Sequence, residues 1–225
     1  MAEINPLLFY MQAADYPDIL EELDKIPCDK FIVKYMPYPW PHNLARDFFL
    51  EHEEYTHLIV HPQDLLVKKE HYDALLADIK KYDYPVLSGV CNVERMGHAW
   101  ANMWAICKIC PSKFRNERRY FWVPACKDNI GIMEVEFQGM VFCWIKRDVI
   151  ERVNLEGEYI FQGTIHTDGR PAPDLNFCIN CKKAGIPIHA DTDVRMFHYA
   201  NHKPSLVNIK PAEKLFIRNG ISVLA

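Results

Sequence analysis

Residues 56–64 form a short apolar run that ends at a proline and an acidic residue: Thr56-His57-Leu58-Ile59-Val60-His61-Pro62-Gln63-Asp64. A short run of this kind is typical of a strand buried on both faces, as in a parallel sheet. Pro62 predicts that the strand stops there, because proline cannot donate to a sheet ladder. Three further runs have the same character, at residues 7–11, 31–33 and 85–90.

Segments with helical spacing separate these four runs. We expect the first helix to be capped by Asp15 and to carry Pro17 in its first turn. The apolar positions of the three helices are Ile19, Leu20, Leu23 and Ile26, then Leu44, Ala45, Phe48 and Phe49, then Tyr72, Leu75, Leu76 and Ile79. The alternation of strands and helices predicts helices packed on both faces of a largely parallel sheet.

The second half of the chain is less uniform. No firm element is expected in residues 92–133, and residues 156–173 are expected to form a loop. The expected strands are residues 140–146, 187–189 and 194–197, and the expected helices begin at Asp148 and Asp174, the latter ending at Gly185. Two apolar runs, residues 215–218 and 221–224, flank Asn219-Gly220 and predict a β-hairpin.

Together these patterns predict one α/β domain over residues 1–225. The expected sheet is mixed but mostly parallel and flanked by helices, with a core at about residues 6–199 and a β-hairpin tail in an extension of residues 200–225. The chain has 225 residues, 49% of them hydrophobic and 25% charged, which is ordinary for a folded protein. No repeat, low-complexity tract or Gly/Ser linker divides it.

Composition also restricts the function classes. The chain has 26 Lys and Arg against 30 Asp and Glu, a net charge of −4, so no global basic field would hold nucleic acid. Its longest apolar runs fall far short of the about 20 residues that a membrane helix needs. The stretch Met1-Ala2-Glu3-Ile4-Asn5-Pro6 has no basic region, so we expect no secretory signal and predict a cytoplasmic protein.

Polar residues follow two of the predicted strands and open one predicted helix. Asp64 comes shortly after the strand that ends at Val60, Asp174 opens a helix, and His198 follows the strand 194–197. In open α/β sheets, ligands bind beyond the carboxyl ends of the strands. Each residue also has a structural interpretation, as a turn former, a helix cap or an edge histidine.

The order of these motifs resembles glycosyltransferases with the glycosyltransferase-A fold, family-2-like. The matching core strand is Glu134-Val135-Glu136-Phe137-Gln138-Gly139-Met140-Val141-Phe142-Cys143-Trp144-Ile145-Lys146-Arg147-Asp148-Val149. Pro173-Asp174-Leu175-Asn176-Phe177-Cys178-Ile179-Asn180-Cys181-Lys182-Lys183-Ala184-Gly185 is similar to the family's acidic helix, and Asp191-Thr192-Asp193-Val194-Arg195-Met196-Phe197-His198 to its closing strand. Ala45-Arg46-Asp47 and residues 55–64 occupy the places of an Ala-Arg helix and an acidic metal motif.

The resemblance implies transfer of a sugar, of the hexosyltransferase type, from a nucleotide-sugar donor to an acceptor hydroxyl. Asp64 and His198 match metal-binding positions of the family, and a divalent Mn²⁺ or Mg²⁺ would offset the charge of the leaving diphosphate. Asp174 matches the general base of inverting members. The implied donor-binding residues are Arg46, Gln63 and Gly139. The acceptor, a glycan, a lipid or a protein, is not specified.

The sequence departs from this family at several positions. Pro62 stands where the first Asp of the metal motif is expected, with His61 and Gln63 as its polar neighbours. Pro173 replaces an acidic residue before the base, and Met140-Val141 replaces two small residues, which would narrow the acceptor side. An alternative hypothesis is therefore a catalytically degenerate protein of the same fold that binds a sugar or a nucleotide.

Two Cys-x-x-Cys pairs support a third hypothesis, a zinc-stapled binding module. Cys107 and Cys110 form one pair, and Cys178 and Cys181 the other. Four thiolates would suit a structural zinc ion, although the pairs lie farther apart than in common zinc modules. A disulfide and buried free thiols are the alternatives, because cysteines three apart on a helix often act as small core residues.

Overall fold

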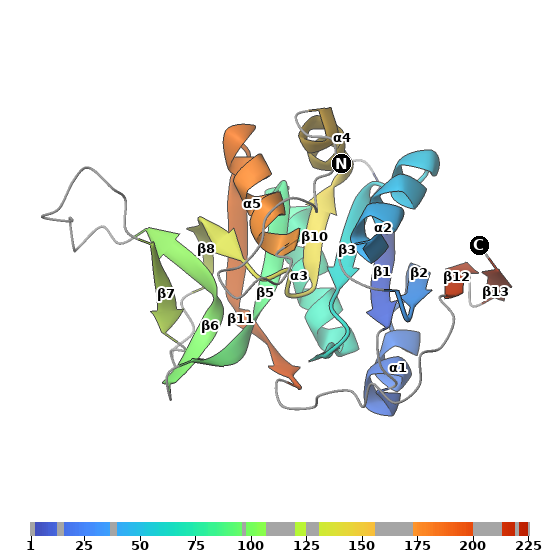
Figure 1. Cartoon of the computed structure of the whole chain (residues 1–225), viewed down its shortest axis with the longest axis horizontal. Helices are drawn as coiled ribbons and strands as arrows, with labels where there is room; N and C mark the ends of the chain where they lie inside the picture. The colour runs from blue at the N-terminus through green and yellow to red at the C-terminus, as the bar shows by residue number, and fades with distance from the viewer. Residues whose placement is uncertain are drawn as a thin grey trace, which may run out of the picture.

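The computed structural model describes residues 3–12, 16–36, 40–95, 98–106, 120–124, 131–155, 173–199, 213–218 and 221–224. Five helices and thirteen strands lie within these ranges (Figure 1). The helices are α1 (Pro17–Asp24), α2 (Trp40–Glu51), α3 (Lys69–Tyr82), α4 (Arg147–Leu155) and α5 (Pro173–Lys183). The strands are β1 (Pro6–Gln12), β2 (Asp29–Lys34), β3 (His57–His61), β4 (Leu65–Leu66), β5 (Val86–Arg95), β6 (His98–Ile106), β7 (Tyr120–Pro124), β8 (Ile132–Val135), β9 (Phe137–Gln138), β10 (Cys143–Lys146), β11 (Ile188–His198), β12 (Glu213–Arg218) and β13 (Ile221–Leu224).

The strands form a mixed sheet in the order β13-β12-β2-β1-β3-β10-β5-β11-β4. β1 is parallel to both β2 and β3, and β5 is parallel to β11. β10 lies antiparallel between β3 and β5. The predicted α/β class is confirmed, whereas the expectation of a mostly parallel sheet holds only for the β2-β1-β3 and β5-β11 groups. β3, β5, β1 and β11 all run in one direction, so their carboxyl ends share one edge.

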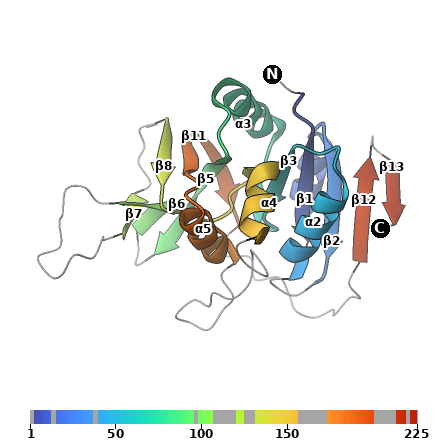
Figure 2. The same ribbon diagram turned by 90° about the horizontal axis from the view of Figure 1, so that it is seen from above.

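Two hydrophobic clusters fill the space between this sheet and its helices. Leu7, Phe9 and Met11 of β1 belong to the cluster that contains the buried faces of α2, α4 and α5. Leu8 and Tyr10 belong to the cluster that contains those of α1 and α3. Successive side chains of a strand point to opposite faces, so the continuous apolar run of β1 produces both clusters. Figure 2 shows α3 on one side of the sheet and α4 and α5 on the other.

The sequence-based boundaries need four corrections. Residues 92–133, where no element was expected, contain the end of β5, the strands β6 and β7 that continue it as an antiparallel group, and the start of β8, which pairs with β11. The two expected late strands are one strand, β11, with a bulge between Ala190 and Arg195. β10 begins only at Cys143, after a turn, and the residue at the N-cap of α1 is Tyr16 rather than Asp15. Asp15 itself lies outside the described residues.

The predicted tail hairpin extends the sheet. β12 pairs antiparallel with β13, and its other side pairs antiparallel with β2. Phe216 of β12 packs against Phe48 of α2, with ring centroids 5.0 Å apart. The hairpin therefore covers the edge that β2 would otherwise expose.

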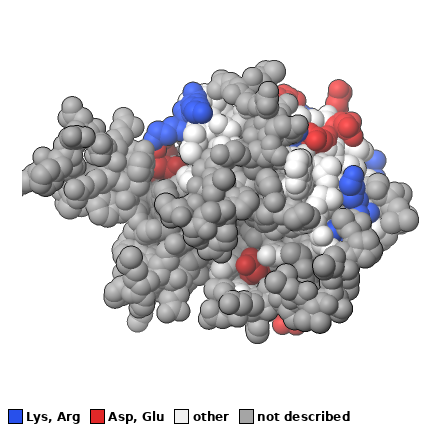
Figure 3. Space-filling view, viewed as in Figure 1, with Lys and Arg blue, Asp and Glu red and all other residues white. Residues whose placement is uncertain are grey.

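Two further observations concern the hydropathy of the helices and the surface charge of the described residues. In the described part of the chain, no helix is long and apolar enough to cross a membrane. On the face in Figure 3, the described basic and acidic side chains form small separate groups of both signs. That face shows no continuous basic surface among the described residues.

Candidate functional site

A cavity at the carboxyl edge of the parallel strands collects several of the predicted site residues. Asp64, Gly139, Asp174 and His198 all line it. These residues come from the segment after β3, the β9–β10 loop, the first turn of α5 and the end of β11. The cavity volume is about 140 Å³, smaller than the about 300–1,000 Å³ of typical small-molecule sites. It would therefore enclose the reacting part of a large ligand rather than the whole ligand.

Backbone pairing holds Asp64 and His198 together. β4 pairs antiparallel with the end of β11, which places Leu65 opposite His198. The Tyr199 N–H also donates to the Asp64 carbonyl, at 2.9 Å. As a result, the Asp64 Oδ2 lies 3.3 Å from the His198 Nε2, and both side chains are partly exposed. An oxygen and an imidazole nitrogen thus meet in the cavity wall.

Asp174 lies in the first turn of α5. Its Oδ1 accepts a hydrogen bond from the Leu175 N–H at 2.8 Å. Pro173 begins the helix, a position that suits proline because its missing N–H would have no partner within the helix. The amino end of a helix carries partial positive charge, which favours a carboxylate in its ionised form. Asp174 is only partly buried, so the cavity has access to its carboxyl group.

The loop before β10 forms another wall. Met140 and Val141 line the cavity, and their effect on the acceptor side stays a prediction. Met140 and Phe142 have φ values of 52° and 48°, unusual for residues other than glycine. The Val141 carbonyl accepts a hydrogen bond from the Gly89 N–H at 3.1 Å, which ties the loop to β5. Strained backbone of this kind concentrates at functional sites.

Two cavity residues were not found from the sequence. His42 lies in the first turn of α2, and Cys91 lies in β5. Complete burial lowers the pKa of His42 to about 3, so its imidazole is neutral at physiological pH. Pro41 directly before it marks a helix start, which was the available signal. The approach of α2 to the cavity depends on packing that local sequence does not encode.

Three residues near the predicted metal and donor motifs do not line the cavity. Arg46, one turn after His42, is buried and donates from Nε to the Asp47 Oδ1 at 2.8 Å. Gln63 accepts a hydrogen bond from the Tyr10 hydroxyl at its backbone oxygen, at 3.3 Å. His61 is buried against Tyr10 and Phe142, and its Nδ1 lies 2.7 Å from the Pro62 carbonyl oxygen.

The donor set of this cavity is compatible with a divalent metal that also binds a ligand. Mn²⁺ accepts carboxylate oxygen together with imidazole nitrogen, and Mg²⁺ sites commonly use one or two carboxylates plus phosphate oxygens. Within the described ranges, no group of three or more His, Cys, Asp or Glu side chains could hold a metal ion. Asp64 and His198 are therefore a two-residue set, which a bound phosphate would have to complete.

The cysteines give no evidence for a zinc site in the described part of the chain. Cys178 and Cys181 are free and buried in the cluster under α5, with Cys143 in the same cluster. Burial raises the pKa of all three thiols, that of Cys143 to about 12, so they stay protonated. Cys107 and Cys110 lie outside the described residues, and a site that includes them stays a prediction.

Comparisons with known proteins address the fold. No family model matches the chain, and no curated protein matches it. Among solved structures, one described as "Crystal Structure of A197 from STIV" superposes with a TM-score of 0.58 and 16% sequence identity, over 98% of this chain and 94% of that one. The chain has the fold of A197 from STIV. A structure of apo UDP-glucose pyrophosphorylase is a more distant match, with a TM-score of 0.42 and 11% identity over 84% of this chain and 90% of that one.

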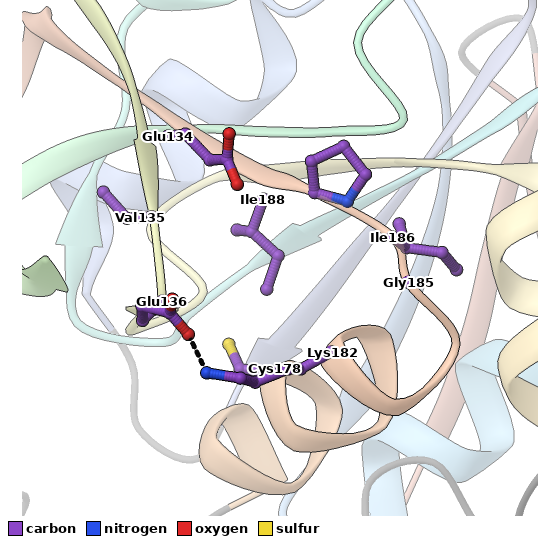
Figure 4. A pocket seen from close by; sticks show the side chains of 9 residues that line it. Glu134, Val135, Glu136, Cys178, Lys182, Gly185, Ile186 and Ile188 are labelled. Atoms are coloured by element: carbon purple, nitrogen blue, oxygen red, sulfur yellow. Dashed lines mark hydrogen bonds and ion pairs between the residues drawn. The ribbon is translucent and has the colours of Figure 1, made fainter. Parts of the chain in front are cut away.

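A second cavity lies between β8 and α5 (Figure 4). Glu134 and Glu136 approach it from one side and Lys182 from the other. Glu136 and Lys182 form an ion pair and the Cys178 thiol is protonated, so Glu134 is the remaining acidic side chain among the described residues of this cavity, and neither the predicted general base nor the predicted Mn²⁺ or Mg²⁺ ligands line it. The cavity at the carboxyl edge is therefore the stronger candidate.

Proposed function

We propose that this protein transfers a sugar from a nucleotide-sugar donor to an acceptor hydroxyl with inversion, with Asp174 as the general base. The observation that carries the proposal is the meeting of Asp64, Asp174 and His198 in one cavity, although they lie far apart in the sequence. The cavity lies beyond the carboxyl ends of the strands, where open α/β sheets bind ligands. The motif order of residues 134–198 supports the same function.

Asp174 would act on the acceptor. Its carboxylate would take the proton from the acceptor hydroxyl while that oxygen bonds to the anomeric carbon of the donor sugar. The bond from this carbon to the diphosphate oxygen breaks in the same step, and the bonding electrons leave with the diphosphate. A positioned base of this kind contributes about 10²–10⁴-fold to the rate.

Asp64 and His198 would hold a Mn²⁺ or Mg²⁺ ion with the donor diphosphate. Such an ion supplies positive charge to the leaving diphosphate. The amino end of α2 would contribute in the same direction, because His42 in its first turn lines the cavity. This helix end would also support diphosphate binding, since the metal ion would have only two protein ligands.

A second candidate function is nucleotide-sugar binding without transfer. Pro62 favours it, because this residue lines the cavity in place of a metal-binding carboxylate. The fold and the cavity would then be retained for recognition. Turnover separates the two functions, whereas binding is common to both.

A thermal-shift titration with nucleotide sugars, with and without Mn²⁺, tests the proposal. A donor at about 100 times its Kd adds about 2.7 kcal/mol to the stability of the folded protein, or about 5–10 °C in Tm for a chain of this size. We expect this shift to need Mn²⁺ and to shrink in Asp64→Asn and in His198→Ala.

Asp73→Asn is the matched control, since Asp73 is a half-exposed carboxylate on α3 that pairs with Lys69 away from the cavity. Equal Mn²⁺-dependent shifts in the control and both site variants would remove the metal assignment. A donor shift without sugar transfer to any hydroxyl acceptor, or to water, would favour the second candidate.

A further inference from the structure

Two large aromatic side chains of the described residues are mostly exposed. Phe197 is 61% exposed, more than any other large hydrophobic side chain in the described ranges, and Trp40 is 53% exposed. Phe197 directly precedes the cavity residue His198 but does not itself line the cavity. A single exposed ring is common on protein surfaces, but exposed rings that form a group indicate a ligand surface.

Phe197 belongs to a cluster of three rings from opposite ends of the chain. Its centroid lies 5.0 Å from that of Tyr199 in an edge-to-face arrangement. Tyr199 stacks on Tyr16, the N-cap residue of α1, with centroids 5.5 Å apart and ring planes at 27°. We call Tyr16, Phe197 and Tyr199 the aromatic platform.

Polar contacts join the platform to the cavity and restrict its movement. The Tyr199 hydroxyl donates to the Asp18 Oδ2 at 3.3 Å, and its N–H donates to the Asp64 carbonyl. Tyr16 is joined to this position through its stacking on Tyr199. Through Tyr199, the platform is therefore next to the Asp64–His198 pair.

We propose that the aromatic platform binds a pyranose ring of an uncharged acceptor saccharide. Apolar C–H faces of a sugar suit aromatic rings, and its hydroxyls suit the Asp18 carboxylate beside Tyr199, which accepts hydrogen bonds. This carboxylate would repel an anionic acceptor such as a phosphorylated sugar. Because it names the acceptor class, this inference rests on the proposed function.

Saccharide binding can be measured without catalysis. The probes are methyl glycosides of glucose, galactose, mannose and N-acetylglucosamine, titrated into the full chain and followed by saturation-transfer NMR. We expect at least one to bind, and Phe197→Ala to weaken that binding about tenfold. Phe197→Trp should preserve it, because a ring remains. Phe197 is exposed, so neither variant should lower the Tm.

Two controls separate this site from the rest of the molecule. Tyr82→Ala removes an aromatic ring that is 47% exposed at the end of α3 and should leave saccharide binding unchanged. Tyr199→Phe keeps the ring but removes its bond to Asp18, so it tests the polar contact alone. Mn²⁺-dependent nucleotide-sugar shifts should be equal in wild type and Phe197→Ala.

Three results would overturn the inference. One is a wild-type protein that binds none of the glycosides, and another is equal loss in Tyr82→Ala and Phe197→Ala. The third is that Phe197→Ala retains saccharide binding but loses binding to another ligand. If that ligand is the nucleotide sugar, the platform holds a nucleobase, and if it is a phosphatidylcholine vesicle, the platform holds a lipid. Saccharide binding that persists without any transfer would remove the proposed function and keep the platform.

Discussion

The Asp174 carboxylate has two positions to fill at once, since it accepts a backbone hydrogen bond in the first turn of α5 and also lines the cavity. Asp174→Asn keeps the shape of the side chain and much of its capping ability. We expect sugar transfer to fall about 10²–10⁴-fold, with nucleotide-sugar shifts preserved.

Asp148→Asn is the control for this change, because Asp148 occupies the first turn of α4 and does not line this cavity. Its turnover should equal that of the wild type. Asp174→Asn with full turnover and a lower Tm would show that Asp174 acts only as a helix cap.

Asp191 makes stability depend on pH. Burial and a hydrogen bond with Asp78 raise its pKa from 3.8 to about 6. Between about pH 4 and 6 the folded protein therefore holds a proton that the unfolded chain releases, so stability falls as pH rises through this window and stays lower above it. Asp191→Asn should raise the free energy of unfolding by about 1 kcal/mol, or about 2–4 °C in Tm, at pH 7.

The pH profile of this difference is the decisive measurement. The Asp191→Asn gain should disappear at pH 4, where the wild-type carboxyl is neutral, and Asp73→Asn on α3 should show no such trend. A gain that is equal at pH 4 and pH 7 would contradict the role of the raised pKa.

At the scale of elements, the alternating first half of the chain was predictable. In the second half β10, α4, α5 and the tail hairpin were also predictable, whereas β6, β7, β8 and β9 were not. β1, β2, β3 and α3 follow local signals, apolar runs and helical spacing, which do not depend on partners. The sequence predicts two strands where the structure has the single strand β11, because its bulge puts the polar residues 191–193 inside the strand. Asp64, Asp174 and His198 were predictable because each follows a strand or opens a helix, whereas His42 enters the cavity only through the packing of α2.

Gly89 of β5 lies opposite the bulge of β11. A Cβ at this position would lie 2.7 Å from the Val194 carbonyl oxygen and 2.4 Å from the Met196 Cε. The methionine end can move but the backbone oxygen cannot do so without shifting β11. Gly89→Ala should therefore lower the free energy of unfolding by about 1–3 kcal/mol, seen as a lower midpoint in urea.

Ser88→Ala on the same strand is the matched control. The Ser88 Oγ is buried without a hydrogen-bond partner among the described residues, so its removal should cost little. Equal stability of Gly89→Ala and the wild type would show that β11 adjusts at its bulge.

At the scale of the whole molecule, the proposed site and the tail hairpin lie at different parts of the sheet. The proposed site uses β3, β5 and β11 with the amino ends of α2 and α5, while β12 closes the other side of the sheet beyond β2. Residues 200–225 were predicted as an extension outside the core. The pairing of β12 with β2 and the contact of Phe216 with Phe48 lead us to expect that β12 unfolds together with the core.

Phe216→Ala tests this cooperative unit. Phe48 stacks on Phe31 of β2 with ring centroids 4.3 Å apart, and Phe216 lies tilted against Phe48, so the three rings form a cluster that joins β12, α2 and β2. Removing its half-buried ring should lower the free energy of unfolding by about 1–3 kcal/mol. Fluorescence and circular dichroism should still report one transition, and nucleotide-sugar shifts should persist because the cavity lies three strands away. Lys214→Ala, an exposed change on the same strand, should have no effect. If Phe216→Ala left the main transition unchanged, β12 would dock on a core that folds without it, and the protein would consist of that core and a separable tail.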